Sequence, residues 1–354
     1  MDLINLGYNQ NFEKYIKENK LSDFEIGRVT AEHKERYTVC SANGEYDAEI
    51  TGNMRFTAQG REDFPAVGDW VAMMVHDTDF AIIHSVLPRF SLIKRQAVGQ
   101  FGEVQIIAAN IDYAFLVQAA DRDFNINRLE RYLTLCNSSK VSPIIILNKI
   151  DLIDEQLLAE IINSIKARID EVPIIAISNE SKQGLSKIQA MIEPGKTYCM
   201  LGSSGVGKST LLNNLVGRQL MQTNHISFSN NKGRHVTSHR ELIVLDSGGI
   251  IIDNPGMREV GIADSSDGLE ITFDRIISLG HSCKFKDCTH TVETGCAVLQ
   301  AIDCGEIDRA SYENYLKMER EKTWFESTQV ERRKRDKEFG KMVKSVKKIK
   351  GIGR

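Results

Sequence analysis

Alternating apolar and polar positions in the first part of the chain predict a β-rich unit. Between Phe24 and Ile93, short apolar stretches are separated by Gly, Asn and Asp turn signals, which is typical of strands joined by tight turns. Five short strands in about 70 residues favour a small barrel of the OB type, with an SH3-like barrel or sandwich as the alternative. The expected strands are Glu25–Thr30, Arg36–Cys40, Tyr46–Ile50, Trp70–Val75 and Phe80–Val86.

From Ile106 onward the pattern changes to apolar strands that alternate with amphipathic helices. Near-continuous apolar strands indicate a parallel sheet covered by helices on both faces. After about Ile262, a segment rich in Cys and His precedes a charged helical stretch from Asp308 onward. The expected strands are Ile111–Gln118, Ser142–Leu147, Val172–Ile177 and Thr197–Leu201, then Leu242–Asp246 and Gly249–Asp253 as a hairpin-like pair; the expected helices are Asn127–Asn137, Glu155–Ile169, Leu185–Ile192 and Ser209–Val216.

A glycine-rich segment directly after the strand Thr197–Leu201 carries the first chemical signal. It reads GSSGVGKS and matches the phosphate loop G-x-x-x-x-G-K-[ST]. Its glycines let backbone N–H groups turn toward phosphates, and the helix N-terminus that follows favours negative charge. Lys208 is expected to contact the β- and γ-phosphates, and Ser209 to bind Mg²⁺. The candidate phosphate-binding residues are Gly202, Ser203, Ser204, Gly205, Val206, Gly207, Lys208, Ser209 and Thr210.

A second motif, NKID at residues 148–151, indicates which base is bound. The Asp151 carboxylate can accept hydrogen bonds from guanine N1–H and the N2 amine, and adenine offers neither donor. Asn148 is expected to tie this segment to the phosphate loop, and the stem of Lys149 to cover one face of the base. Ser178 and Asn179 are candidates for backbone N–H donors to the guanine carbonyl, with a plain loop as the alternative interpretation.

The segment DNPG at residues 253–256 matches D-x-x-G at the end of an expected strand. Asp253 is expected to hold Mg²⁺ through water, and the Gly256 N–H to contact the γ-phosphate. Between this motif and the phosphate loop, residues 232–238 read KGRHVTS, polar and glycine-bearing like a mobile switch. Thr237 is expected to give Mg²⁺ its second hydroxyl, with Ser238 as the alternative.

Met257 stands where many GTPases carry a glutamine that orients the attacking water. An apolar side chain cannot orient water, so His235 becomes the candidate for this catalytic role. The alternative is that His235 faces solvent or contacts a partner.

Cys283, Cys288, His290 and Cys296 place three thiolates and one imidazole within 14 residues. This donor set is typical of a closed, structural, tetrahedral zinc site. Zinc is expected to supply folding energy to a segment too small for a core of its own. Cys304 is an alternative ligand, and the remaining cysteines, Cys40, Cys136 and Cys199, are expected to be core residues.

Composition and charge favour a cytoplasmic location and a polyanionic partner. The net charge of −3 conceals a basic C-terminus: residues 331–354 hold eleven Lys and Arg against three Asp and Glu, or +8, leaving −11 for the rest. This tail is expected to bind a polyanionic partner, and an OB-type barrel is a plausible surface for binding RNA. No apolar run approaches the roughly 18 residues that span a bilayer, and there is no export signal, so a cytoplasmic location is expected.

The order NKID, GSSGVGKS, GRHVTS, DNPG, after a small barrel and before a Cys/His segment, resembles the RsgA (YjeQ) family of circularly permuted GTPases. In most GTPases the phosphate loop precedes the base-reading motif; here the order is reversed. The resemblance covers nearly the whole chain, from about Phe24 to the tail. It implies an OB-fold at residues 1–98, a permuted P-loop GTPase of α/β type at 99–264, and a mostly α-helical zinc-binding domain with a basic tail at 265–354.

The resemblance also implies a function, since family members are small-ribosomal-subunit-dependent GTPases that act late in subunit maturation. It implies a monomer that binds the small subunit and its rRNA, uses Mg²⁺ with GTP and holds one structural zinc. The alternative is an rRNA-binding checkpoint scaffold in which hydrolysis is incidental; a large-subunit GTPase would not need this barrel and Cys/His segment. The family switch reads His-Thr-Thr-Thr, from which Val236 and Ser238 depart, and this leaves open which hydroxyl binds Mg²⁺.

The permuted order places the switch segments directly before the Cys/His segment. We therefore expect nucleotide state to reach that segment through Met257–Asp267. Because Met257 replaces the usual glutamine, hydrolysis is expected to be weak without the ribosomal partner.

Overall fold

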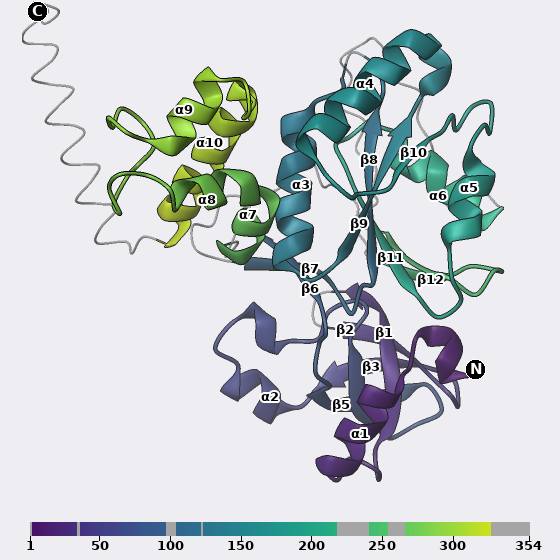
Figure 1. Ribbon diagram of the computed structural model, residues 1–354. Coiled ribbons are helices and arrows are strands. Elements are labelled where there is room, and N and C mark those ends of the chain that lie inside the picture. The colour runs from purple at the N-terminus through teal and green to yellow at the C-terminus, as the bar shows by residue number, and fades with distance from the viewer. Residues whose placement is uncertain are drawn as a thin grey trace, which may run out of the picture.

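The chain forms a barrel, a central sheet with helices on both faces, and a helical C-terminal part that lies beside the sheet (Figure 1). The computed structural model describes residues 2–33, 36–96, 104–121, 123–217, 241–253 and 266–326. The basic tail and five of the candidate switch residues lie outside the described residues: His235, Thr237, Ser238, Gly256 and Met257.

The N-terminal strands close into a five-stranded barrel with the order β1-β2-β3-β5-β4 and a closing pair between β1 and β4. β3 and β5 run parallel, and the other pairs are antiparallel. This Greek-key barrel confirms the OB prediction over the SH3-like alternative. The strands are β1 (Glu25–His33), β2 (Arg36–Ser41), β3 (Glu45–Ile50), β4 (Trp70–Val75) and β5 (Phe80–Val86), at the predicted positions.

Two helices beside the barrel were not predicted. α1 (Gln10–Glu18) begins at the N-cap Asn9, whose side chain accepts from the Asn11 N–H. α1 buries Phe12 and Ile16 in a cluster with Trp70. α2 (Gly52–Thr57) follows β3 and buries none of its residues.

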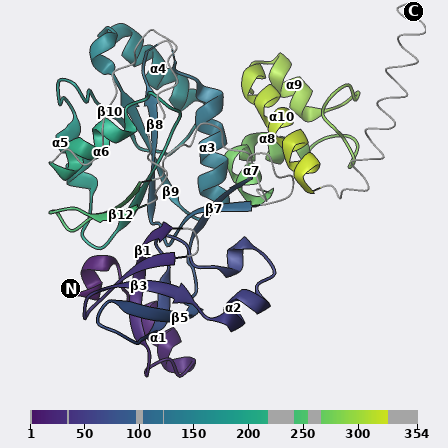
Figure 2. The same ribbon diagram turned by 180° about the vertical axis from the view of Figure 1, so that it is seen from behind.

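The central sheet has the strand order β10-β9-β8-β11-β13-β12. All neighbouring pairs are parallel except the predicted hairpin pair of β12 and β13. Figures 1 and 2 show α3 and α4 on one face and α5 and α6 on the other. The strands are β8 (Tyr113–Ala119), β9 (Ser142–Asn148), β10 (Ile174–Ala176), β11 (Thr197–Leu201), β12 (Glu241–Val244) and β13 (Ile250–Asp253); the helices are α3 (Ile126–Ser138), α4 (Glu155–Arg168), α5 (Leu185–Met191) and α6 (Lys208–Val216).

Alternate residues of each central strand enter different cores, as a sheet buried on both faces requires. In β8, Ala114 and Leu116 join the cluster beneath α3 and α4, whereas Phe115 and Val117 join the cluster beneath α5 and α6. The parallel order brings the carboxyl ends of β8, β9, β11 and β13 to one edge of the sheet. In α/β sheets, that edge is where ligands bind.

The barrel and the central sheet are connected by two features that the sequence did not predict. β6 (Leu92–Gln96) and β7 (Val104–Ala109) form an antiparallel hairpin that spans the expected boundary between residues 98 and 99. In addition, β1 pairs with β12 at Ala31 and Glu241, so that strands of both units belong to one continuous sheet.

Within the described residues 266–326, four helices pack around an apolar cluster of their own, which includes Phe273, Val298 and Met318. This C-terminal part lies against α3, where Gly268 allows close approach: a Cβ there would stand 2.0 Å from Ser138 Oγ and 2.3 Å from the Thr134 carbonyl oxygen. The helices are α7 (Ser266–Thr272), α8 (Asp274–Gly280), α9 (Ala297–Asp303) and α10 (Arg309–Glu326). Within the described parts of the chain, no helix is both long and apolar enough to cross a membrane.

Candidate nucleotide and metal sites

The phosphate loop lies between β11 and α6, at the carboxyl edge of the central sheet. Gly205 and Gly207 have φ angles of 83° and 96°, a region that glycine adopts without strain. A Cβ on Gly207 would lie 2.2 Å from Asn148 Nδ2, so this position also requires the absence of a side chain. The loop therefore keeps its backbone close to the base-reading segment.

Asn148 ties the two motifs together, as expected from the sequence. It lies at the end of β9, is buried, and donates from Nδ2 to the Val206 carbonyl oxygen at 2.7 Å. Its Oδ1 accepts from the Asn179 N–H at 3.2 Å, and Asn179 Nδ2 donates to the Gly207 carbonyl oxygen at 2.9 Å. Two asparagines, one at the end of β9 and one in the turn after β10, thus fix the loop.

The remaining base-reading residues gather beside Asn148. Lys149 has a φ angle of 66°, and its Nζ lies 3.3 Å from Asp121 Oδ2. Asp151 is exposed in a short 3-10 turn, Ile150–Leu152. Ser178 is buried, and its Oγ accepts from the Ser181 N–H at 3.0 Å, so it shapes this turn.

Lys208 begins α6 and points back over the loop. Its Nζ donates to the carbonyl oxygens of Gly202 and Ser203, both at 2.7 Å. Burial lowers the pKa of Lys208 to about 8, while the negative charge of Asp253 opposes that shift. Phosphate oxygens beside this ammonium would stabilise its charged form in the same way.

Other candidate residues lie near this cation. Ser209 and Thr210 follow Lys208 in the first turn of α6, where Ser209 is exposed. Asp253 ends β13, the neighbour of β11, and is half-buried. The structure thus brings all of the described nucleotide candidates to one edge of the sheet.

One residue at the loop was not predicted. Arg128, in the first turn of α3, donates from Nη1 to Ser203 Oγ at 3.0 Å. The two residues are 75 positions apart, and nothing in the local sequence around Arg128 distinguishes it from an arginine on a solvated helix face.

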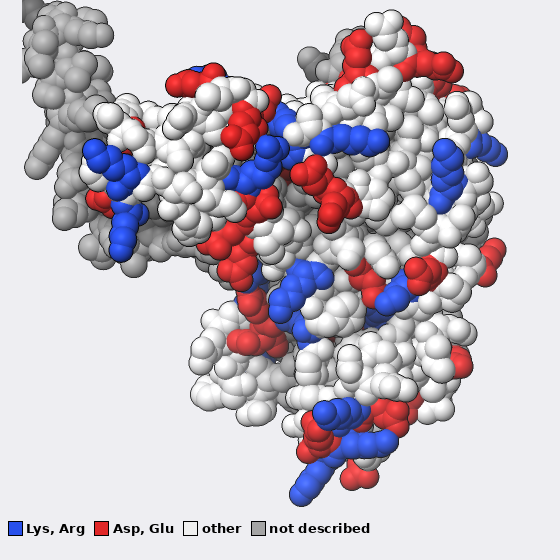
Figure 3. Space-filling model, viewed as in Figure 1, with Lys and Arg blue, Asp and Glu red and all other residues white. Residues whose placement is uncertain are grey.

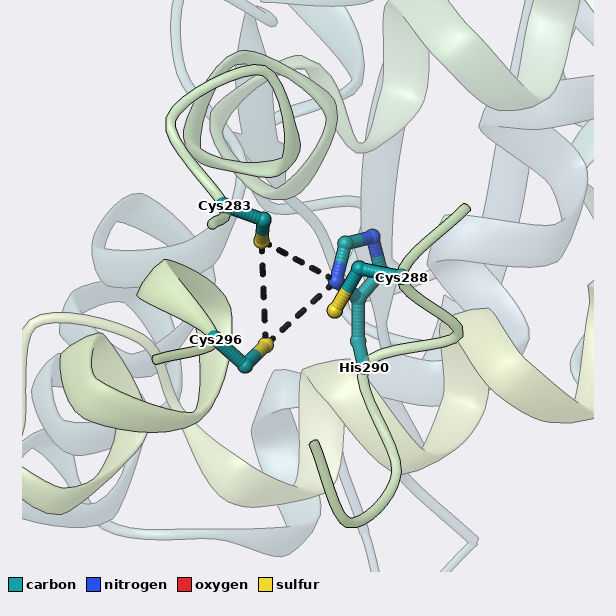
Figure 4. Close-up of side chains that lie close together, drawn as sticks. All are labelled: Cys283, Cys288, His290 and Cys296. Atoms are coloured by element: carbon teal, nitrogen blue, oxygen red, sulfur yellow. Dashed lines mark hydrogen bonds between the residues drawn. The ribbon is translucent and has the colours of Figure 1, made fainter. Parts of the chain in front are cut away.

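The second candidate site is the Cys/His cluster between α8 and α9. Figure 4 shows the side chains of Cys283, Cys288, His290 and Cys296 directed toward a common centre, and their ligand atoms all lie within 4.8 Å of one another. Cys283 Sγ is 3.8 Å from Cys296 Sγ and 3.5 Å from His290 Nδ1, and Cys296 Sγ is 3.4 Å from His290 Nδ1. Bonds of about 2.3 Å to a tetrahedral ion imply sulfur–sulfur separations of about 3.8 Å, so the group fits a metal ion.

Neighbouring groups hold these ligands in place. The Tyr312 hydroxyl, from α10, donates to the His290 carbonyl oxygen. Glu293 accepts from the Thr289 N–H and Oγ1 and from the N–H groups of Thr291 and Val292. These hydrogen bonds lower the pKa of Glu293 to about 2.

The other cysteines divide as follows. Cys304 is exposed and is not a member of the cluster, so its alternative role as a ligand has no support in the structure. Cys136 and Cys199 are buried in the core, as predicted, and Cys40 is half-buried in β2.

The sequence matches a family of known GTPases. The family model described as RsgA GTPase matches residues 86–263. A relative in Bacteroides thetaiotaomicron, named small ribosomal subunit biogenesis GTPase RsgA 1, is 38% identical over 348 residues, which is 97% of this chain and 96% of the relative. A relative in Opitutus terrae, named small ribosomal subunit biogenesis GTPase RsgA, is 38% identical over 335 residues, or 92% of this chain and 90% of that protein.

Two solved structures are similar as well. YjeQ from Thermotoga maritima aligns with a TM-score of 0.61 at 26% identity and covers 83% of this chain and 96% of its own. YloQ, described as a circularly permuted GTPase, aligns with a TM-score of 0.60 at 25% identity and covers 83% and 93% of the two chains.

Proposed function

Because this chain belongs to the RsgA GTPase family, we propose that it binds the small ribosomal subunit and hydrolyses GTP to GDP and phosphate late in the maturation of that subunit. As a member of the family it is a GTP hydrolase. The observation that carries the proposal is the extent of the match: the Bacteroides relative aligns over 97% of the chain, so the similarity includes the barrel and the Cys/His cluster as well as the nucleotide site.

In the proposed mechanism, backbone N–H groups of residues 202–207 and the Lys208 ammonium hold the phosphates. Asp151 accepts hydrogen bonds from guanine, and Lys149 covers the base. Ser209 and Thr237 would hold Mg²⁺, and Asp253 would support it; when bound, the ion would neutralise charge on the phosphates. The Gly256 N–H would contact the γ-phosphate, and His235 would orient the attacking water.

We further propose that the metal bound by Cys283, Cys288, His290 and Cys296 is zinc and that its role is structural. Three thiolates and one imidazole fill the four positions of a tetrahedral ion and leave none open for a substrate. The 3.8 Å between the sulfur atoms of Cys283 and Cys296 supports this ion.

The three proposed domains are residues 1–98, 99–264 and 265–354. We propose that the protein acts as a monomer in the cytoplasm, where small subunits mature. Its rRNA contacts would come from the barrel and from the tail, whose net charge is +8.

The decisive experiment measures GTP hydrolysis by the purified chain with small subunits, with large subunits and with neither. We expect stimulation by small subunits alone. Equal rates in all three reactions would refute a ribosome-dependent switch and favour the checkpoint scaffold, in which nucleotide only sets rRNA affinity.

Guanine recognition has a separate test. Asp151→Asn should shift the preference from guanine toward xanthine nucleotides, because an amide cannot accept both guanine N–H donors. Asp154→Asn is the matched control, since Asp154 caps α4 through the Leu157 N–H and Asn caps equally well. Retained GTP selectivity in Asp151→Asn would show that another residue reads the base.

A further inference from the structure

The first turn of α3 lies between the phosphate loop and the C-terminal part. Its position is fixed from β8 by Gln118, which is fully buried. Gln118 Nε2 donates to the Asn125 carbonyl oxygen at 2.9 Å, and Gln118 Oε1 accepts from the Asn125 N–H at 3.0 Å. Asn125 is in turn the N-cap of α3, and its side chain accepts from the Arg128 N–H at 3.1 Å. The backbone at Arg128 is thus anchored to the sheet.

On one side of this turn, Arg128 reaches the phosphate loop. Arg128 donates to the Ser203 side chain, and Lys208 donates to the Ser203 carbonyl oxygen. Two cations therefore converge on Ser203, one from α3 and one from the loop's own lysine. A shift of the Arg128 contact would move the backbone to which Lys208 is bonded.

On its other side, the same turn binds α10. Asn314 Nδ2 donates to the Asn127 carbonyl oxygen at 3.2 Å and to Glu130 Oε2 at 2.6 Å. Ser311 Oγ donates to Glu130 Oε1 at 2.8 Å, and Arg168 of α4 pairs with the same carboxylate at 2.7 Å. Glu130 and Asn314 are both buried, so these contacts are shielded from water.

We propose that Arg128 is a positioning residue for GTP hydrolysis, which holds the phosphate loop at Ser203 and ties the position of the loop to helix α10. The path runs from Ser203 through Arg128 to Asn127 and Glu130, and from there to Asn314. It uses one helical turn and is separate from the route through Met257–Asp267, most of which lies outside the described residues.

The mechanism of Arg128 is geometric, because the residue acts through Ser203. Without the contact, the loop still encloses the phosphates, but its donors are less precisely placed for the charge that develops during transfer. Misplacement of this kind lowers turnover more than it lowers binding. The phosphates of GDP need no such alignment, so GDP affinity should change little.

The inference rests on GTP hydrolysis at this loop and not on the ribosomal partner, so the test uses the full-length chain alone under steady-state conditions. Failure of ribosomal stimulation would contradict the proposed function without altering the comparison among variants. The variants are Arg128→Gln, Arg128→Lys, Ser203→Ala, and the combination of Arg128→Gln with Ser203→Ala. Lys140→Gln, at an exposed position just beyond the far end of α3, is the control for loss of a positive charge.

We expect Arg128→Gln and Ser203→Ala each to lower kcat by about tenfold, with KM and GDP affinity changed by less than about twofold. Because both changes break one contact, the double variant should be no slower than either single variant. Arg128→Lys, which keeps a charged donor, should recover most of the rate. A normal kcat in Arg128→Gln, an additive loss of about a hundredfold in the double variant, or a loss confined to KM would each overturn the positioning role.

A separate measurement tests the link between Arg128 and α10. Amide hydrogen exchange across α10 should differ between GDP and a non-hydrolysable GTP analogue in the wild type and in Lys140→Gln. The difference should disappear in Arg128→Gln and in Ser203→Ala. The link to α10 would be refuted if exchange in α10 were the same with both nucleotides in the wild type. It would also be refuted if exchange still differed between the nucleotides in both Arg128→Gln and Ser203→Ala.

Discussion

The barrel and the C-terminal part are joined to the central sheet by different kinds of contact. The barrel is joined through the backbone pairing of β1 with β12. The buried guanidinium of Arg28 in β1 also donates to the Asn110 carbonyl oxygen, just after β7, at 3.0 Å, and to those of Leu6 and Gly68 within the N-terminal unit at 2.5 and 3.1 Å. Val67, next to β4 of the barrel, packs into the same apolar cluster as the residues beneath α3 and α4.

The C-terminal part has a separate apolar cluster and meets α3 largely through polar and charged side chains. Glu130 pairs with Arg168 and binds α10, Arg131 pairs with Glu321, and Asn137 Nδ2 donates to Thr272 Oγ1 at 3.0 Å. Figure 3 shows acidic and basic side chains side by side along this junction. The barrel and the sheet thus share backbone pairing and the apolar contact of Val67, although the barrel also has apolar clusters of its own. Within the described residues, the C-terminal part has only its separate cluster, so we expect its docking on α3 to depend on charge and salt.

Removal of the metal should produce the largest difference in stability between the barrel and the C-terminal part. Structural zinc contributes about 10–16 kcal/mol to small zinc-dependent folds, so chelation should unfold residues 266–326 and leave the barrel and sheet intact. Cys296→Ser should act in the same way, because serine keeps the cap that Cys296 gives to α9 but is a poor zinc ligand. Hydrogen exchange of the three regions measures the effect.

Cys304→Ser is the matched control, since Cys304 is exposed and outside the cluster. Equal loss of protection in the barrel and in the C-terminal part after chelation would show that the two folds depend on each other.

The sequence predicted those features that depend on neighbouring residues. The strands of the barrel and of the central sheet follow from apolar periodicity, and the phosphate loop and the Cys/His cluster follow from motifs of fewer than 15 residues. The hairpin of β6 and β7 was missed because its strands contain polar residues such as Lys94 and Gln105, which break the alternation.

The contacts between distant segments could not be predicted. Arg28 lies in a predicted strand, yet its burial depends on carbonyl oxygens supplied by Leu6 and Asn110. Arg128 meets Ser203 only because the strand that precedes α3, β8, lies next to β11, the strand that precedes Ser203. Such contacts require the fold, since no local pattern distinguishes these arginines from exposed ones.

Loss of the Arg28 side chain tests the junction between the barrel and the sheet. Arg28→Met removes three charge-assisted hydrogen bonds and leaves buried carbonyl groups with fewer donors, which should cost about 4 kcal/mol of unfolding free energy. Because β1 pairs with β12, the exchange free energies of these two strands should fall together. Arg36→Met, at an exposed position paired with Glu49 in the barrel, should cost less than about 0.5 kcal/mol.

If Arg28→Met lowered protection in β1 alone, the barrel and the sheet would be separate cooperative units. The barrel and the C-terminal part would then differ only in the chemistry of their contacts with the sheet, and not in whether they unfold together with it.

Loss of the Glu130 carboxylate tests the docking of the C-terminal part. Glu130→Ala removes the closer ion-pair partner of Arg168, whose side chain is 9% exposed, and leaves only Asp308 at 3.9 Å. It also takes an acceptor from Ser311 and Asn314. Breaking one side of a buried ion pair costs about 3–5 kcal/mol, and a value near 3 kcal/mol is expected here because Asn127 still accepts from Arg168.

The pattern of hydrogen exchange should distinguish Glu130→Ala from Arg28→Met. Protection should fall in α7 and α10 and remain in β1 and β12. Glu313→Ala, at an exposed position on α10, is the control and should change neither. Loss of protection throughout the chain would mean that the C-terminal part is as firmly joined as the barrel.

The smallest effect is expected at the partly exposed ion pair of Arg131 and Glu321, where the two side chains are 19% and 36% exposed. Two parallel hydrogen bonds join them, at 2.5 and 2.8 Å, but solvent screens the pair, so either Arg131→Glu or Glu321→Arg should weaken docking by about 1 kcal/mol. The double exchange should restore most of the loss, because the opposite charges face each other again. At 1 M salt, where the screening length is about 3 Å, the single variants should approach the wild type, whereas the cost of Arg28→Met in the buried barrel junction should persist. If both junctions showed the same salt dependence, the distinction between backbone and side-chain attachment would be lost. If the losses of the two single variants added up in the double exchange, the ion pair would contribute nothing to docking.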